Sequence, residues 1–161
     1  MALIKVADNG ISSGIATPAF EAFRSSNQTG LSSANTFYKI QCDAEIYDSD
    51  SCYDNSTNYR FTPTVAGKYY LYAKVTTNDA SVTTKYFDLA FYKNGTRFTS
   101  NFIGADGDYY PTITASHTVD ANGSSDYFEV YVRWFDDVPT GVHGSSANIY
   151  TNFGGFRIIG T

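Results

Sequence analysis

The sequence predicts an all-β domain, either a sandwich or a barrel, and three observations support this fold class. Tyrosine (14) and phenylalanine (12) far outnumber the four leucines, and aromatic side chains suit a half-buried sheet surface, whereas helices favour Leu, Ala, Glu and Lys. Short runs of alternating apolar and polar residues are separated by turn residues. No sustained period of about 3.6 residues is present. At 161 residues with 42% apolar residues, the chain is long enough for one domain with one core.

The alternating runs define the candidate strands. In chain order they cover residues 19–24, 36–46, 67–76, 85–93, 97–103, 112–119, 127–135 and 149–159. The step KNGT at residues 93–96 is the strongest local signal, because Asn-Gly tolerates the positive φ angles of a tight hairpin turn. We therefore expect a hairpin between the strands at 85–93 and 97–103.

Two of these strands have one apolar face and one face that suits water, namely residues 85–93 and 127–135. The side chains expected on their outward faces are Tyr86, Asp88, Tyr92, Tyr127, Glu129, Tyr131 and Arg133. Such strands belong in an outer sheet that faces solvent.

Residues 67–76 are apolar on both faces. Tyr69, Leu71, Ala73 and Val75 share one parity and suit the core, while the opposite parity has Tyr70 and Tyr72 before its first charge at Lys74. The last strand behaves alike, with Phe153 on one parity and Phe156 on the other. A sandwich has only one core, so we predict that the second apolar face of this inner sheet is covered by another chain.

Residues 1–17 are predicted to form an N-terminal arm that precedes a domain over residues 18–161. The arm contains Gly10, Gly14 and paired serines, and its apolar residues are too sparse to build a core. These apolar residues, which we expect to order against something else and to attach the protein to a particle, are Leu3, Ile4, Val6, Ile11 and Ile15.

The charge pattern excludes several classes of partner. The net charge is −5, and Lys and Arg are scattered singly, so nucleic-acid binding is disfavoured. No apolar run approaches the roughly 20 residues that span a bilayer, and MALIKVADNG lacks the apolar stretch of a secretory signal. We expect a chain that needs no Sec export, or one whose signal has been removed.

Cys42 and Cys52 are too few for a disulfide scaffold or a four-cysteine zinc site. We expect both to be free thiols, with Cys42 buried.

Catalytic motifs are weak in this sequence. GISSG at residues 10–14 has the letters of the Gly-x-Ser-x-Gly nucleophile elbow around Ser12, but it lacks the strand and helix that this motif needs. His117 shares its parity with core-type residues, which indicates a packed strand histidine, and His143 is predicted to be a loop residue. We therefore predict that the protein is not an enzyme and has no catalytic residues.

Acidic loops are the better chemical signal, because carboxylates are ligands for calcium. The loop residues concerned are Asp48, Asp50, Asp54, Asp106, Asp108, Asp136 and Asp137. None fits the EF-hand pattern, and the favoured interpretation is that they are turn residues that form local hydrogen bonds. No cofactor is predicted, and Ca²⁺ stays as the alternative without assigned ligands.

Several segments resemble the C1q/TNF-like family. Its central signature, a Phe followed six residues later by the Gly of a Gly-x-Tyr strand, is similar to the set Asp48, Tyr53, Phe61, Gly67, Tyr69 and Leu71. Outside it, PAFEAFRSS resembles the first strand of the family, FYKNG its central hairpin, DANGSSDYFEVYV its penultimate strand and NFGGFRI its closing strand. The resemblance spans roughly residues 18–160. CYDNSTNYRFTPTVAGKYYLYAKV, after an arm that begins MALIKV, is similar to C1q-like structural proteins of tailed bacteriophages.

The resemblance implies a ten-strand antiparallel jelly roll and homotrimers packed through the inner sheet, with Tyr70 and Tyr72 in the three-fold interface. It also implies a role in binding or building, without catalysis. We therefore expect a homotrimeric structural protein on the virion surface of a tailed phage, a capsid decoration protein whose partner is the major capsid protein. The alternative is a receptor-binding head, joined to a fibre shaft protein, that recognises host glycan or protein through its loops. The short arm favours decoration.

Overall fold

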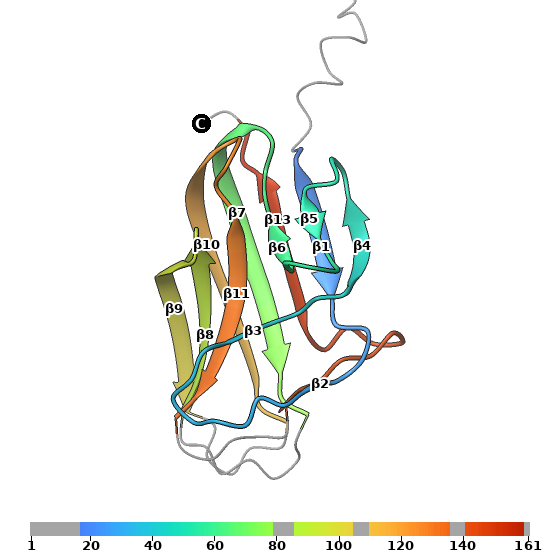
Figure 1. Ribbon diagram of the computed structural model, residues 1–161, viewed down its shortest axis with the longest axis vertical. Helices are drawn as coiled ribbons and strands as arrows, with labels where there is room; N and C mark the ends of the chain where they lie inside the picture. The colour runs from blue at the N-terminus through green and yellow to red at the C-terminus, as the bar shows by residue number, and fades with distance from the viewer. Residues whose placement is uncertain (1–16, 79–85, 105–109, 136–140, 160–161) are drawn as a thin grey trace, which may run out of the picture.

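The protein folds as a sandwich of two antiparallel sheets (Figure 1). The computed structural model describes residues 17–78, 86–104, 110–135 and 141–159. This part of the chain contains thirteen strands and no helix, so it has no helix that could cross a membrane. The predicted all-β jelly-roll sandwich is confirmed. The described residues divide into thirteen strands where ten were expected, and five of the thirteen are only two residues long.

The inner sheet has five strands in the order β10 (Thr112–Asn122), β7 (Ala66–Thr76), β13 (Asn152–Arg157), β1 (Ala19–Phe23) and β4 (Ala44–Asp48). It therefore contains both strands whose sequences are apolar on two faces, β7 and β13, and these two strands are directly paired.

The outer sheet has six strands. Five follow the order β5 (Tyr53–Asp54), β6 (Arg60–Phe61), β11 (Phe128–Trp134), β8 (Tyr86–Lys93) and β9 (Thr96–Gly104), and β3 (Tyr38–Lys39) pairs with β11. The remaining pair, β2 (Gln28–Thr29) with β12 (Gly141–Val142), lies at the end of the sandwich away from residue 17 (Figure 1).

Aromatic rings from both sheets fill the core. Phe20 of β1 stacks on Tyr53 and on Phe61, with ring centroids 4.9 and 4.3 Å apart. At the other end of the core, Trp134 stacks on Phe87 at 5.6 Å, and both are fully buried. The abundance of Phe and Tyr in the sequence is thus explained by stacking between the two sheets.

The predicted hairpin is confirmed. Asn94 and Gly95 have φ angles of 53° and 76°, and they connect β8 to β9, whose Lys93 and Thr96 are paired. Positive φ at both positions is the geometry that matches the twist of the flanking strands.

The prediction of a single strand over residues 36–46 is wrong. Its first part is β3 in the outer sheet and its second part is β4 in the inner sheet, so the chain crosses between the sheets after Lys39. Ile40 and Cys42 lie in this crossing and are buried. Alternation of apolar residues continues through the crossing because the segment passes through the core, and this is why the sequence reads as one strand.

Candidate interaction surface

The outward side of the inner sheet carries aromatic side chains, because the strand register brings them together. Opposite residues in antiparallel strands point to the same side. Tyr70 of β7 is opposite Phe156 of β13, and Tyr72 is opposite Gly154. On the next strands, Glu21 of β1 is opposite both Gly154 and Tyr47 of β4. We call the surface formed by Tyr47, Tyr70, Tyr72 and Phe156 the aromatic face.

The aromatic face lies outside a core that is already complete. Tyr69, Leu71 and Val75 on the other side of β7 are 0% exposed. By contrast, Tyr47 and Phe156 remain 43% and 38% exposed, and Tyr70 and Tyr72 are half-buried. The predicted alternation along residues 67–76 is therefore confirmed, with Tyr70 and Tyr72 pointing away from the core.

A glycine makes room for Tyr72 on this face. A Cβ atom at Gly154 would lie 2.3 Å from Cζ of Tyr72, so a side chain there would displace the ring. Tyr70 is held from both sides, with ring centroids 6.4 Å from Tyr72 and 5.5 Å from Phe156. The rings therefore lie low on the sheet and form a continuous apolar surface.

A carboxylate lies at the polar centre of the aromatic face. The hydroxyl of Tyr72 donates to Oε2 of Glu21 at 3.2 Å, and the amide of Asn152 donates to Oε1 at 2.7 Å. Burial raises the pKa of Tyr72, and the neighbouring Tyr47 hydroxyl and Glu21 carboxylate raise it further. Tyr72 therefore stays protonated and keeps donating its hydrogen bond.

The aromatic face continues into a groove of about 700 Å³ beside β9 and β10. Tyr70 and Tyr72 line one side of it, and its other side is lined by polar residues that include Ser100, Asn101 and Thr114. The amide of Asn101 donates to the carbonyl of Thr114 at 3.0 Å and joins the two strands. The result is an apolar surface with a polar border.

The opposite side of the molecule differs from the expectation of a face open to water. The predicted outward orientations in β8 and β11 are confirmed, but Asp88 and Glu129 are only 1% and 4% exposed. Glu129 is covered by an ion pair with Lys39, whose Nζ lies 2.5 Å away, and Asp88 by Arg133 at 2.8 Å. The expectation failed because β3 adds residues beside β11 that pack over this face.

Aromatic rings complete this cover. Tyr92 packs on Tyr131 with ring centroids 4.1 Å apart. The guanidinium of Arg133 lies 4.4 Å from the Phe37 ring and 4.2 Å from the Phe135 ring. The outward face of the outer sheet is therefore covered by its own side chains around Asp88 and Glu129, while Tyr86 and Phe102 remain 49% and 64% exposed on β8 and β9.

Of the candidate acidic loop residues that the structure describes, Asp48 and Asp54 cap turns, and Asp50 accepts from the Ser49 hydroxyl at 2.6 Å. Asp48 accepts from the backbone N–H of Tyr53 at 2.8 Å. Asp54 accepts from the backbone N–H groups of Thr57 and Asn58 at 2.9 and 3.0 Å, and hydrogen bonds of this kind hold its pKa well below the usual range. Asp106, Asp108, Asp136 and Asp137 lie outside the described residues. Within the described part, no three His, Cys, Asp or Glu side chains gather where a metal ion could bind.

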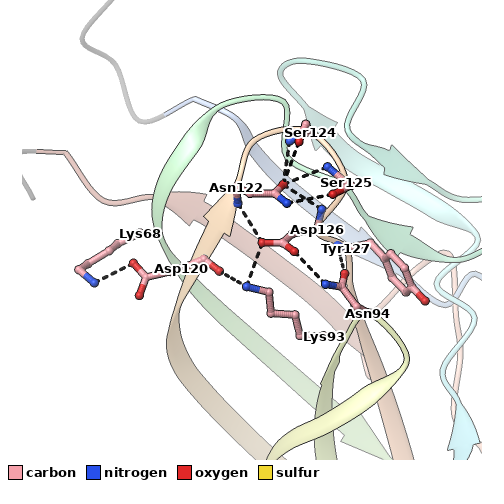
Figure 2. Close-up of polar contacts among 9 residues, drawn as sticks. All are labelled: Lys68, Lys93, Asn94, Asp120, Asn122, Ser124, Ser125, Asp126 and Tyr127. Carbon is pink, nitrogen blue, oxygen red and sulfur yellow. Dashed lines mark hydrogen bonds and ion pairs between the residues drawn. The ribbon is translucent and has the colours of Figure 1, made fainter.

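Asp126, which sequence reasoning did not single out, ties two loops together (Figure 2). Its carboxylate accepts from the side-chain amide of Asn94 at 2.8 Å and from the backbone N–H of Asn122 at 2.9 Å. The ammonium of Lys93 lies 2.9 Å away. This network joins the β8–β9 turn to the β10–β11 loop and explains the polar residues of DANGSSDY structurally.

The candidate nucleophiles and bases do not come together. Ser12 lies outside the described residues. The His117 and Phe98 ring centroids lie 5.6 Å apart. The prediction of a packed His117 is wrong, because β10 is an edge strand and leaves this side chain exposed. His143, a loop residue as expected, stacks on Tyr150 at 4.0 Å.

The thiols are also poor nucleophiles. Both cysteines are free, as predicted, and both are buried, which was predicted only for Cys42. Burial raises the pKa of the Cys42 thiol to about 12 and also raises that of Cys52, so both stay protonated.

The proposed attachment residues Leu3, Ile4, Val6, Ile11 and Ile15 lie outside the described residues. Sequence reasoning also missed Tyr47 and Glu21 as members of the surface around Tyr72. Tyr47 could not be assigned to this surface from the sequence, because the chain changes sheets between β3 and β4, and only β4 pairs with β1. Glu21 could not be assigned to this surface from the sequence, because it reaches Tyr72 only through the pairing of β1 with β13.

Comparison with known proteins defines the fold class. No protein-family model matches the sequence, and no curated protein sequence matches it significantly. Solved structures do match: the globular domain of zebrafish complement 1qA aligns with a TM-score of 0.56 at 17% identity, covering 88% of this chain and 97% of that one. Murine APRIL aligns with a TM-score of 0.63 at 10% identity, covering 87% and 98%. The chain therefore has the C1q/TNF-like jelly-roll fold.

A viral protein is among the similar structures. Vertex protein P5 of the phage PRD1 aligns with a TM-score of 0.66 at 16% identity, covering 89% of this chain and 98% of that one. The similarity thus extends over nearly the whole of both chains.

Proposed function

We propose that this protein is a non-enzymatic homotrimer, built through the aromatic face, that decorates the capsid on the surface of a phage virion. The observation that carries the proposal is the aromatic face itself. It lies on the outward side of a sheet whose other side already fills the core. An apolar surface of this kind on a soluble sandwich marks a site of association.

The energy of burying the aromatic face supports association. A fully exposed tyrosine ring would contribute about 4 kcal/mol at about 25 cal/mol per Å². The four rings are already partly buried within one chain, so each contributes about 1–2 kcal/mol more when a second copy covers it. Their sum is enough to offset part of the entropy lost on association.

The fold supports three-fold assembly and a virion location. The C1q/TNF-like resemblance implies trimers packed through the inner sheet, and the aromatic face lies on that sheet. Similarity to a phage vertex protein supports a place on the virion surface. The partner in this proposal is the major capsid protein, contacted by the arm over residues 1–17 through Leu3, Ile4, Val6, Ile11 and Ile15.

Light scattering of purified protein tests the assembly. We expect a trimer for the wild type at micromolar concentration and monomers for the double variant Tyr70→Glu, Tyr72→Glu, because carboxylates in an apolar interface are costly to desolvate. Phe156→Glu, at a more exposed position of the aromatic face, should also give monomers and keeps the test valid if the double variant misfolds.

Phe102→Glu is the matched control. Phe102 is 64% exposed on the outer sheet, opposite Asp88, so this variant adds a carboxylate in place of an exposed ring away from the aromatic face and should stay trimeric. A monomeric wild type, or folded aromatic-face variants that remain trimeric, would contradict the proposal.

A receptor-binding head is the second candidate function, and an aromatic pocket at the C-terminal end of β7 favours it. Electron micrographs of virions with and without this protein separate the two functions. Loss of surface knobs with unchanged adsorption to the host supports decoration. Intact shells that no longer adsorb support receptor binding.

A further inference from the structure

A second concave site lies at the far end of β7, the end that the arrowhead marks in Figure 1. It has a volume of about 540 Å³ and is lined by Lys74, Thr76, Tyr110, Thr112, His143 and Tyr150. All six residues belong to one chain, so a single copy forms the pocket, with Lys74 on the same side of β7 as Tyr70 and Tyr72. Its size suits a small ligand of one or two rings.

Aromatic rings form one wall of this pocket. His143 stacks on Tyr150 with ring centroids 4.0 Å apart and planes 18° apart, and the Tyr110 ring lies 5.9 Å from His143. The backbone N–H of His143 donates to the carbonyl of Thr76 at 2.7 Å, which fixes the loop against β7. A flat apolar surface is therefore held in place before any ligand arrives.

Two hydroxyl groups form the floor. Oγ1 of Thr76 and Oγ1 of Thr112 lie 2.9 Å apart, so one hydroxyl donates to the other. The second hydroxyl keeps its proton for a carbonyl, that of Tyr150 at 3.0 Å from Thr76 or that of Tyr110 at 3.2 Å from Thr112. The remaining lone pairs can accept hydrogen bonds from ligand hydroxyls.

A single cation completes the pocket. Nζ of Lys74 donates to the carbonyl of Ile149 at 2.6 Å, which uses one of its three N–H groups. Among the residues that the structure describes, no carboxylate forms an ion pair with Lys74. Within the described residues, its positive charge is therefore left for a ligand anion.

We propose that this pocket binds a saccharide that carries a carboxylate. A pyranose ring has an apolar C–H face that can pack on the face of the Tyr150 ring not covered by His143, and a rim of hydroxyls that can donate to Thr76 and Thr112. The carboxylate pairs with Lys74. A single lysine without a cluster of backbone N–H groups suits a carboxylate better than a phosphate, whose sites collect several donors.

Isothermal titration with matched sugars tests the proposal. The probes are N-acetylneuraminic acid, 3-deoxyoctulosonic acid and methyl glucuronide, with methyl glucoside as the neutral counterpart of the last. We expect at least one acid to bind with a Kd of the order of millimolar, and the neutral sugar to bind at least about tenfold more weakly.

Variants identify the site. Tyr150→Ala should abolish binding of the acid, and Lys74→Gln should weaken it about tenfold, while Lys68→Gln should leave it unchanged. Lys68 is the matched control because it lies on the same side of β7, six residues away, and forms an exposed ion pair with Asp120. Thermal unfolding verifies that each variant is folded, and Tyr150→Leu replaces Tyr150→Ala if that variant is not.

Two results overturn the proposal: no acid binds more tightly than the neutral sugar, or binding persists in both Tyr150→Ala and Lys74→Gln. Light scattering of the same samples reports trimer formation separately. Failure of the sugar site is therefore distinguishable from failure of the proposed assembly.

Discussion

Asp126 shows how one side chain joins two turns that are distant in the sequence. It is 7% exposed and bonds to Asn94 and to the backbone of Asn122, with Lys93 beside it (Figure 2). The pKa of Asp126 lies below its usual range, chiefly because the Asn94 amide bonds to the carboxylate and because Lys93 is close. A carboxylate with a lowered pKa stabilises the folded state when it is ionised.

We predict that Asp126→Asn lowers the free energy of unfolding by about 2 kcal/mol near neutral pH. A lowered pKa means that this stabilisation is complete above the ordinary pKa of about 4 and is lost as the pH falls through the folded-state pKa. The difference between variant and wild type should therefore shrink at about pH 2. Urea unfolding at both pH values measures it.

Asp120→Asn is the control for this prediction. Its carboxylate is 75% exposed and pairs with Lys68 in water, so the variant should change the free energy of unfolding by less than about 0.5 kcal/mol. An Asp126→Asn effect of equal size at both pH values would show that the charge of Asp126 is not what stabilises the loops.

At the scale of strands and sheets, the two outward faces of the sandwich differ in how their side chains are covered. The face of the outer sheet is closed by its own ion pairs and stacked rings, with Asp88 and Glu129 buried beneath them. The face of the inner sheet instead leaves Phe156 and Tyr47 more than a third exposed. The outer sheet also leaves Tyr86 and Phe102 exposed, so the inner face is distinguished by the contact of its exposed Phe156 with Tyr70 and Tyr72 in one apolar surface.

This difference predicts the effect of Tyr131→Glu. The new carboxylate would lie beside Glu129, which already accepts from the Tyr131 hydroxyl at 3.4 Å, and the Tyr92 ring would lose its partner. Burial and the Glu129 charge already raise the pKa of Tyr131 to about 12, so a second negative charge is disfavoured here. We expect a loss of about 2 kcal/mol or more in the free energy of unfolding.

Thermal unfolding measures this loss, with Phe102→Glu as the control at an exposed position of the same sheet. The control places its carboxylate in water opposite Asp88 and should lose less than about 1 kcal/mol. Equal melting temperatures for the two variants would mean that the outer sheet's face is open to water after all.

At the scale of the whole molecule, the residues from 17 onward build a complete core between two sheets. We therefore predict that deleting residues 1–17 leaves a soluble, folded head that no longer joins its particle, because the arm carries the proposed attachment residues. Circular dichroism of the truncated protein and its incorporation into purified virions measure the two effects. Normal incorporation of the truncated protein would assign attachment to the head.

Much of the fold was predictable because local chemistry determines it. The Asn94-Gly95 turn follows from positive φ angles that Asn and Gly tolerate, and the alternation around Tyr70 and Tyr72 follows from the two-residue period of a strand. The separation at Ile40 and Cys42 was not predictable, because a buried crossing between sheets has the same apolar alternation as a strand.

The sequence by itself determined the all-β class, the hairpin at residues 93–96 and the presence of a second apolar face on residues 67–76. Only the tertiary structure decided which residues share that face. Phe156, Glu21 and Tyr47 join Tyr70 and Tyr72 through the pairing of β7, β13, β1 and β4, strands that are far apart in the chain. Local periodicity tells which side chains leave a strand on the same side, but strand order and register are set by packing of the whole core.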